Sequence, residues 1–126
     1  MDLTGQWSGS YVYPGELDPV PFNAAIRDHD GRLSGLVDEP GGAWSTIDVA
    51  HAVLTGERRG RDVSFTKVYD AIEAFPDPVA YDGTLDEDGC EIVGEWHIGP
   101  SWSGSFVMTR PKKVAAEIEA EEVAET

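Results

Sequence analysis

The stretch Leu3-Thr-Gly-Gln-Trp-Ser-Gly-Ser-Tyr-Val-Tyr13 decides the fold of this chain. Side chains alternate between the two faces of a β-strand, so one face of this stretch carries two glycines and the aromatic residues Trp7, Tyr11 and Tyr13. Such an alternation of small and large residues is typical of the inside of a small closed barrel, where side chains fill a narrowing space. The stretch therefore predicts the first strand of an all-β barrel.

The same alternation returns seven more times, between turn signals at short and fairly even spacing. Residues 28–31 and 86–89 both read Asp-x-Asp-Gly, a hairpin sequence, and Pro-Gly pairs break the chain within 14–15 and 39–42. Closing the sheet would remove its exposed edges. The chain is thus predicted to form an eight-stranded antiparallel up-and-down β-barrel, and a two-sheet sandwich is the alternative. The expected strands are residues 3–13, 22–28, 32–38, 48–57, 62–70, 79–86, 91–98 and 102–110.

Glycines share the predicted inward face with the large apolar residues. Inward glycine permits the sharp bends and strong coiling of a small barrel. These glycines are also expected to leave room, which favours a barrel with a cavity for one small ligand over a barrel packed solid. The seven positions are Gly5, Gly9, Gly35, Gly56, Gly83, Gly94 and Gly104.

The chain has 126 residues and a net charge of −15. We expect one barrel domain over residues 1–110, followed by an acidic C-terminal tail over 111–126. Residues 1–110 hold seven Lys and Arg against 19 Asp and Glu, so most of the acidity belongs to the barrel. Such a chain repels nucleic-acid backbones, and no nucleic-acid partner is expected. The spacing of apolar residues in the tail is only partly helical, which predicts a frayed helix or disorder.

Several features predict a cytoplasmic protein. No apolar run approaches the ~20 residues that a membrane helix needs, and no membrane partner is expected. Met1-Asp2-Leu3 leads directly into the first strand, without the basic and apolar segments of a secretory signal. The single cysteine, Cys90, cannot form an internal disulfide, as expected in a reducing compartment.

The two ends of the chain resemble the calycin group of lipocalins, fatty-acid-binding proteins and avidins. Gly5-Gln-Trp7 is similar to the Gly-x-Trp of their first strand, and Arg110 resembles the arginine that packs over that tryptophan. Avidin and streptavidin are the most similar among calycins, over residues 3–7 and 106–110. The resemblance implies an eight-stranded barrel that binds a small molecule and that assembles into dimers or tetramers.

The chain departs from the avidin pattern at the polar positions that hold biotin. Trp96 and Tyr81 fall where avidins place aromatic binding residues. However, Gly9 stands where avidins use an asparagine, and Phe106 and Val37 stand roughly where they use an asparagine and a tyrosine. The resemblance therefore implies a ligand other than biotin.

Lys67 is the most informative polar residue, because Phe65 and Tyr69 on the same strand place it on the inward face. An unpaired buried lysine is costly and needs an anion or hydrogen-bond acceptors. One interpretation is that Lys67 meets the acidic group of a ligand inside the barrel. The other is structural: an internal ion pair with Glu39, or an ammonium group that reaches water at the barrel mouth.

Inward aromatic residues complete the predicted ligand site, since such residues line pockets and their hydroxyl groups orient a guest. A filled core is the alternative interpretation of the same residues. Trp7 and Arg110 are instead predicted to close the barrel by a cation–π contact. The candidate ligand-binding residues are Lys67, Tyr11, Tyr13, Glu39, Phe65, Tyr69, Tyr81, Trp96 and Phe106.

No catalytic motif is found, and the three histidines lack ligand spacing, so neither a metal site nor a cofactor is expected. We expect non-catalytic binding of a small, partly apolar ligand with an anionic group for Lys67. The first alternative is a filled barrel that acts through its surface as an oligomerisation or interaction module, with Trp44 and Trp102 as contacts. The second is an enzyme in which Lys67, Glu39 or a tyrosine serves as acid or base.

Overall fold

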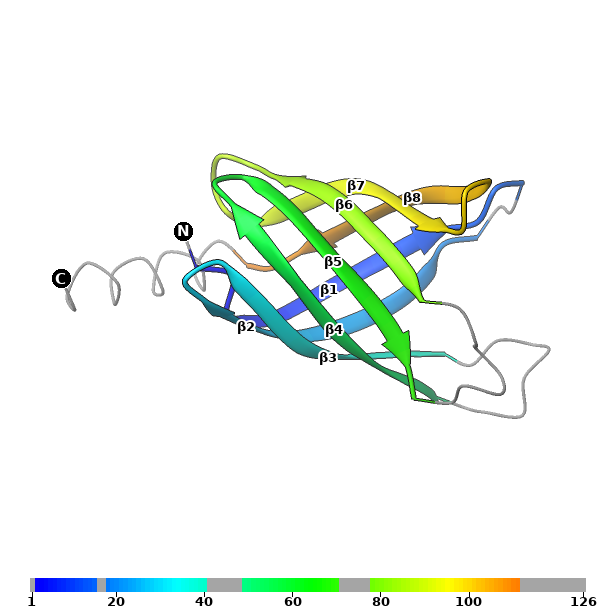
Figure 1. The fold of residues 1–126 in the computed structure, drawn as a ribbon, viewed down its shortest axis with the longest axis horizontal. Helices are drawn as coiled ribbons and strands as arrows, with labels where there is room; N and C mark the ends of the chain where they lie inside the picture. Colours follow the sequence, from blue (N-terminus) through cyan, green and yellow to red (C-terminus); the bar gives the residue numbers. More distant parts are fainter. Residues whose placement is uncertain (1, 16–17, 41–48, 71–77, 112–126) are drawn as a thin grey trace, which may run out of the picture.

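The computed structural model describes residues 2–15, 18–40, 49–70 and 78–111, which form a closed barrel of eight strands. Each strand runs antiparallel to its neighbours, and β8 returns to pair with β1 (Figure 1). The predicted eight-stranded antiparallel barrel is therefore confirmed. No helix in the described part of the chain is long and apolar enough to cross a bilayer. The strands are β1 (Gly5–Val12), β2 (Val20–His29), β3 (Arg32–Pro40), β4 (Val49–Arg59), β5 (Asp62–Tyr69), β6 (Val79–Leu85), β7 (Glu91–Ile98) and β8 (Trp102–Thr109).

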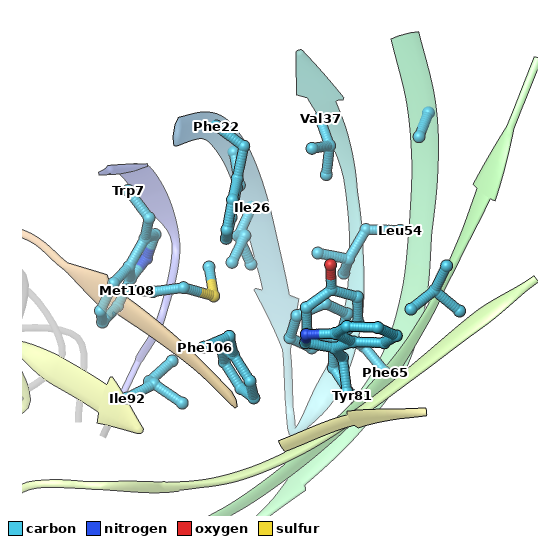
Figure 2. Close-up of a cluster of buried hydrophobic side chains, with 14 of the residues drawn as sticks. Trp7, Phe22, Ile26, Val37, Leu54, Phe65, Tyr81, Ile92, Phe106 and Met108 are labelled. Atoms are coloured by element: carbon cyan, nitrogen blue, oxygen red, sulfur yellow. The ribbon is translucent and has the colours of Figure 1, made fainter. Parts of the chain in front are cut away.

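The core follows from the alternation of the sequence. Side chains at every second position point into the barrel and are buried, while their neighbours lie on the outside. Figure 2 shows Trp7 from β1, Phe22 from β2, and Phe106 and Met108 from β8 converging into this core. The barrel therefore has one continuous core rather than two packed layers.

Three strands extend two residues beyond an expected boundary, and β1 begins two residues later than expected, at Gly5; the other boundaries agree to within one residue. β2 begins at Val20, inside the expected loop, and β4 continues to Arg59, into the expected turn. β3 continues through Glu39 to Pro40, because its ladder with β4 extends over both residues. Glu39 consequently lies on a strand, with its side chain inside the barrel. The predicted frayed helix or disorder of the tail, at 112–126, lies outside the described residues.

The two ends of the barrel differ. At one end, termed the hairpin end, lie the N-terminal residues and the turns that join β2 to β3, β4 to β5 and β6 to β7 (Figure 1). Asp30 and Gly31 in the first of these turns have φ values of 52° and 90°. Two consecutive positive φ values are typical of the type I′ hairpin turn, which Asp-Gly favours. At the other end, termed the mouth, β3 and β5 finish and β4 and β6 begin.

Arg110 and Trp7 close the hairpin end, as predicted. The guanidinium carbon of Arg110 lies 4.7 Å from the centre of the Trp7 ring, and Trp7 Nε1 donates a hydrogen bond to the Leu3 carbonyl at 2.8 Å. Arg110 donates to the carbonyls of Gly89 at 2.9 Å and Asp2 at 2.8 Å. The buried cation is thereby satisfied by an aromatic face and by backbone acceptors from the N-terminal segment and the β6–β7 turn.

Asp28 joins the N-terminus to two hairpins. Its carboxylate accepts hydrogen bonds from the N–H groups of Leu3 at 3.0 Å and Gly31 at 2.9 Å, and from Arg58 Nε at 2.9 Å. Burial acts to raise the pKa of this carboxyl group, but the backbone donors and Arg58 outweigh burial and hold the pKa below its usual value. The ionised form of Asp28 is therefore the one that stabilises the hairpin end.

We expect Asp28→Asn to lower the free energy of unfolding by about 1.5–3 kcal/mol, the worth of a hydrogen bond to a charged group. The amide removes the charge that faces Arg58 and leaves one acceptor atom where the carboxylate has two. Asp30→Asn is the matched control, because Asp30 is exposed and asparagine tolerates its positive φ, so the change should stay within about 0.5 kcal/mol. Urea unfolding measures both variants, and equal midpoints would contradict the role of Asp28.

Candidate functional site

Five of the predicted site residues form a hydrogen-bonded group inside the barrel, towards the mouth. Glu39 Oε1 accepts hydrogen bonds from the hydroxyl groups of Tyr11, at 3.0 Å, and of Tyr69. Glu39 Oε2 accepts one from Lys67 Nζ at 3.0 Å. Lys67 Nζ also donates to the Tyr81 hydroxyl oxygen at 2.8 Å. These five residues, termed the buried polar network, join β1, β3, β5 and β6 through one carboxylate and one ammonium group.

The ammonium group of Lys67 is enclosed by aromatic rings. Its Nζ lies 4.7 Å from the ring centre of Tyr11, 4.8 Å from that of Tyr69 and 5.1 Å from that of Tyr81. The side chains of Lys67 and Glu39 are 3% and 2% exposed, so the two charges compensate each other within the core. Among the described residues, no buried side-chain nitrogen or oxygen lacks a hydrogen-bond partner. The structure thus contains the internal Glu39–Lys67 pair that was the structural alternative for Lys67.

Burial controls protonation in this network. It lowers the pKa of the Lys67 ammonium group, a shift that the Glu39 carboxylate opposes. Burial also raises the pKa values of Tyr11, Tyr69 and Tyr81, and the negative charge of Glu39 adds to all three shifts. The three phenols therefore remain protonated at neutral pH, and two of them serve as donors to Glu39.

The strand pattern explains how these residues meet. Phe65, Lys67 and Tyr69 alternate along β5 and all point inward, and Glu39 occupies the inward position at the end of β3. β1 lies opposite β5 in the closed strand order, so Tyr11 reaches the same carboxylate from across the interior. Residues far apart in the sequence are brought to one level of the barrel by closure alone.

An aromatic cluster continues from this network to the surface at the mouth. The Tyr13 ring lies edge-on to Tyr11 at 5.4 Å and to Trp96 at 5.5 Å, and it stacks on Trp102 at 5.4 Å. Trp96 is buried, and its Nε1 donates to the Val12 carbonyl at 3.0 Å, whereas Trp102 is 45% exposed. Tyr13, Trp96 and Trp102, termed the aromatic rim, thus connect a solvent-exposed ring to the buried polar network.

The remaining predicted residues, Phe65 and Phe106, pack against the network from the hairpin side. The Phe65 ring stacks on Tyr81 at 4.7 Å, and Phe106 meets Tyr81 edge-on at 4.9 Å (Figure 2). All nine predicted site residues therefore form one connected group, and their part in ligand binding stays a prediction. Phe22 was not among them, although its ring lies 5.8 Å from Lys67 Nζ. Its inward position on the strand was the signal that could have identified it.

The room expected beside the inward glycines is filled. A Cβ atom on Gly9 would overlap the ring of Phe22, and one on Gly104 would overlap the indole of Trp96. The prediction that these glycines create a cavity is therefore wrong where neighbours take the space; the glycines allow rings and adjacent strands to approach closely. The inward positions at which a backbone oxygen of a neighbouring strand lies nearest are Gly35, Gly56, Gly83, Gly94 and Gly104.

The outer surface carries a row of apolar side chains across β3, β4 and β5. Leu36 is paired with Val53, and Val53 with Val68, so the three residues lie side by side. They are 64%, 47% and 45% exposed. These residues are termed the apolar row. Of the two tryptophans expected as surface contacts, Trp102 belongs to the aromatic rim and Trp44 lies outside the described residues.

We expect the barrel to lose stability steeply above about pH 10. Unfolded tyrosines ionise near pH 10, whereas the buried phenols keep their protons, so the unfolded state binds fewer protons and stability falls as the pH rises. Three such phenols give a slope of up to ~4 kcal/mol per pH unit. Lys67, whose pKa is lowered, contributes a rise in stability with pH, and this contribution ends near 10.5, where unfolded lysine loses its proton.

Urea unfolding from about pH 9 to 12 measures this slope, and phenolate absorbance should increase together with unfolding. Tyr69→Phe removes one of the three phenols and should reduce the slope by about one third. Trp102→Phe, in the aromatic rim, should leave the slope unchanged. A slope that does not respond to Tyr69→Phe would show that the network does not control alkaline stability.

Comparisons with known proteins support the barrel fold and identify no family. No protein-family model matches this chain, and no curated protein matches its sequence. The chain is similar to a solved structure described as a redesigned β-barrel, with a TM-score of 0.68 over 86% of this chain and 91% of that chain. The two sequences are 11% identical, so this likeness supports the barrel architecture alone.

Proposed function

We propose that the barrel binds a small molecule at its mouth, next to the buried polar network and the aromatic rim. The observation that carries this proposal is the gathering of Glu39, Lys67 and three tyrosines at one level of an otherwise apolar core. The other buried charged residue of the described chain, Arg110, closes the opposite end. Closure of the barrel therefore explains why Arg110 is buried, but it does not explain the buried polar network at the mouth.

Stability alone does not account for this network. Removing charges from water costs several kcal/mol per ion, and apolar residues of similar volume often stabilise a core as well or better. The core towards the hairpin end is apolar, with Leu33, Leu85 and Ile92 buried, so the same fold accepts apolar packing. Donors and acceptors held in fixed positions near a rim of aromatic rings are typical of sites that orient a ligand.

The charges of the network indicate the class of ligand. Glu39 already supplies the anion that Lys67 needs, so the network is neutral overall and favours a neutral ligand over the anionic one expected from the sequence. The stacked rings of Tyr13 and Trp102 offer a flat apolar surface. We therefore propose non-catalytic binding of a planar, partly apolar molecule that stacks on these rings and exchanges a hydrogen bond with the network beneath them. The resemblance to calycins supports binding of a small molecule, and the single cysteine supports a cytoplasmic setting.

Native mass spectrometry of protein purified from cells tests this proposal. We expect a non-covalent adduct on the folded chain that disappears on unfolding. Glu39→Gln combined with Lys67→Met should fold but lose the adduct, since removing both charges leaves neither one alone in the core. Lys67→Met by itself would cost about 3–5 kcal/mol through the uncompensated carboxylate, and it cannot separate binding from folding.

Val93→Thr, a nearly isosteric change on the outside of β7, is the control that should keep the adduct. An adduct that persists in the Glu39→Gln and Lys67→Met double variant would contradict binding at the network. A wild-type spectrum that contains only the mass of the bare chain would contradict binding of a retained cellular ligand.

The apolar row favours a second candidate function, self-association through β3–β5. Its members make up three of the five large apolar residues exposed among the described residues. In the strand register, Arg27 lies on one side of the row and Asp38 on the other, so two copies packed in opposite orientations bring unlike charges together. The row is smaller than the ~800 Å² per partner of a standard interface, so we expect a weak dimer.

Val53→Lys should abolish this dimer in sedimentation velocity, because an ammonium group at the centre of the row cannot be buried between two apolar surfaces. Val93→Lys is the matched control: Val93 is also an outward valine with 47% exposure, but it lies on β7, outside the row. A dimer that survives Val53→Lys, or a wild-type chain that stays monomeric at every concentration, would contradict self-association through the row.

A further inference from the structure

Positive charge on the barrel exterior is confined to the hairpin end. Five of the six arginines of the chain fall between residues 27 and 61, on the β2–β3 and β4–β5 hairpins. Every exposed Arg or Lys among the described residues belongs to this group. They are Arg27, Arg32, Arg59 and Arg61, termed the arginine surface. The exposed acids beside them are Asp30, Glu57, Asp62 and Asp82, so this surface is close to neutral on a chain of −15.

Three of these arginines have no acidic partner among the described residues. Glu57 lies opposite Arg32 in the strand register, yet it pairs with Arg59 at 3.3 Å. No described carboxylate forms an ion pair with Arg27, Arg32 or Arg61. In a chain with 24 Asp and Glu, clustered guanidinium groups without partners form a surface suited to an acidic segment.

The acidic tail of this chain begins at the same end of the barrel. Arg110, just before the tail, donates a hydrogen bond to the Asp2 carbonyl at 2.8 Å. The neighbouring Leu3 N–H donates to Asp28, and Asp28 pairs with Arg58 at 2.9 Å within the β4–β5 hairpin. The base of the tail and the arginine surface are thus connected by a few hydrogen bonds across the hairpin end.

The length and charge of residues 112–126 fit this surface. These 15 residues carry five glutamates, at 117, 119, 121, 122 and 125. They span ~50 Å when extended, or ~22 Å as a helix, compared with the ~13 Å radius of gyration of a domain of this size. The tail is therefore long enough to reach the arginine surface in either conformation.

The charge of the β6–β7 turn also favours a path of the tail towards the arginine surface. Arg110 Nε donates to the Gly89 carbonyl, so the tail starts beside a turn that carries Asp86, Glu87 and Asp88. Lys112 and Lys113, the first residues of the tail, are complementary to this acidic turn. The glutamates that follow have the same sign of charge as this turn and the opposite sign to the guanidinium groups of the arginine surface.

We propose that the acidic C-terminal segment docks on the arginine surface of its own barrel, with its glutamates pairing with Arg27, Arg32 and Arg61. This contact lies at the hairpin end and is independent of ligand binding at the mouth.

Paramagnetic relaxation in the full-length chain tests the proposal. A nitroxide is attached at Ala124→Cys, with Cys90→Ala to remove the buried thiol. Amide signals of residues 27–32 and 58–62 should lose more than half of their intensity, while those of residues 96–98, at the mouth, keep theirs. The signals should recover at about 1 M salt, where the screening length is ~3 Å, and in the triple variant Arg27→Gln, Arg32→Gln and Arg61→Gln.

Charge variants without any cysteine change provide the second measurement. Glu117→Gln, Glu121→Gln and Glu122→Gln together should shift the Nε–H signals of Arg27, Arg32 and Arg61. Removing the same charge from the barrel, with Glu87→Gln, Glu91→Gln and Glu95→Gln, should not shift them. Unchanged arginine signals in the tail variant, or stronger broadening at 86–89 than at the hairpins, overturn the proposal.

A mixture of spin-labelled and isotope-labelled chains identifies the source of the segment. In this mixture the nitroxide and the observed nuclei are on different molecules, so docking within one chain gives no broadening. Broadening of residues 27–32 in the mixture would assign the docked segment to a second copy and overturn docking within the chain.

Discussion

Closure of eight strands into a narrow barrel is the constraint on which the rest of this structure depends. Pairing of β1 with β8 forces every strand to bend, and the interior then holds only side chains that interdigitate. Large rings lie over inward glycines: Phe22 covers Gly9, and Trp96 covers Gly104. The same pairs of small and large residues thus permit the curvature and fill the core that the curvature encloses.

Closure leaves two ends to be sealed, and the chain seals them with different chemistry. At the hairpin end, one cation is satisfied by the Trp7 ring and by carbonyl groups, and tight turns complete the end. Towards the mouth, an acid, a base and three phenols satisfy one another beneath aromatic rings. Closure explains the contact of Arg110 with Trp7. It does not explain the buried polar network, which we propose serves to recognise a ligand.

Period-two alternation made the number and order of the strands and the inward position of Lys67 predictable from the sequence. The contact of Trp7 with Arg110 was predicted instead from the resemblance to calycins. An internal pair of Lys67 with Glu39 was one of the sequence-based alternatives, but the extension of β3 to Glu39 was not predicted, because Pro-Gly-Gly follows it and only the ladder with β4 keeps it on a strand. The volume beside Gly104 depends on Trp96, which lies on another strand. The apolar row likewise depends on the register between strands, which a pattern within one strand does not determine.

The hydrogen bond between Arg110 and the Asp2 carbonyl places the beginning of the first strand beside the end of the last. In a closed ring of strands, none is first in space, and the order of the chain is only one of several ways to connect the same neighbours. A short linker could join residue 110 to residue 2, and the chain could be opened in the 60–61 turn. All eight strand pairings would remain, and only the covalent link between β4 and β5 would be lost. This barrel is therefore a natural candidate for circular permutation.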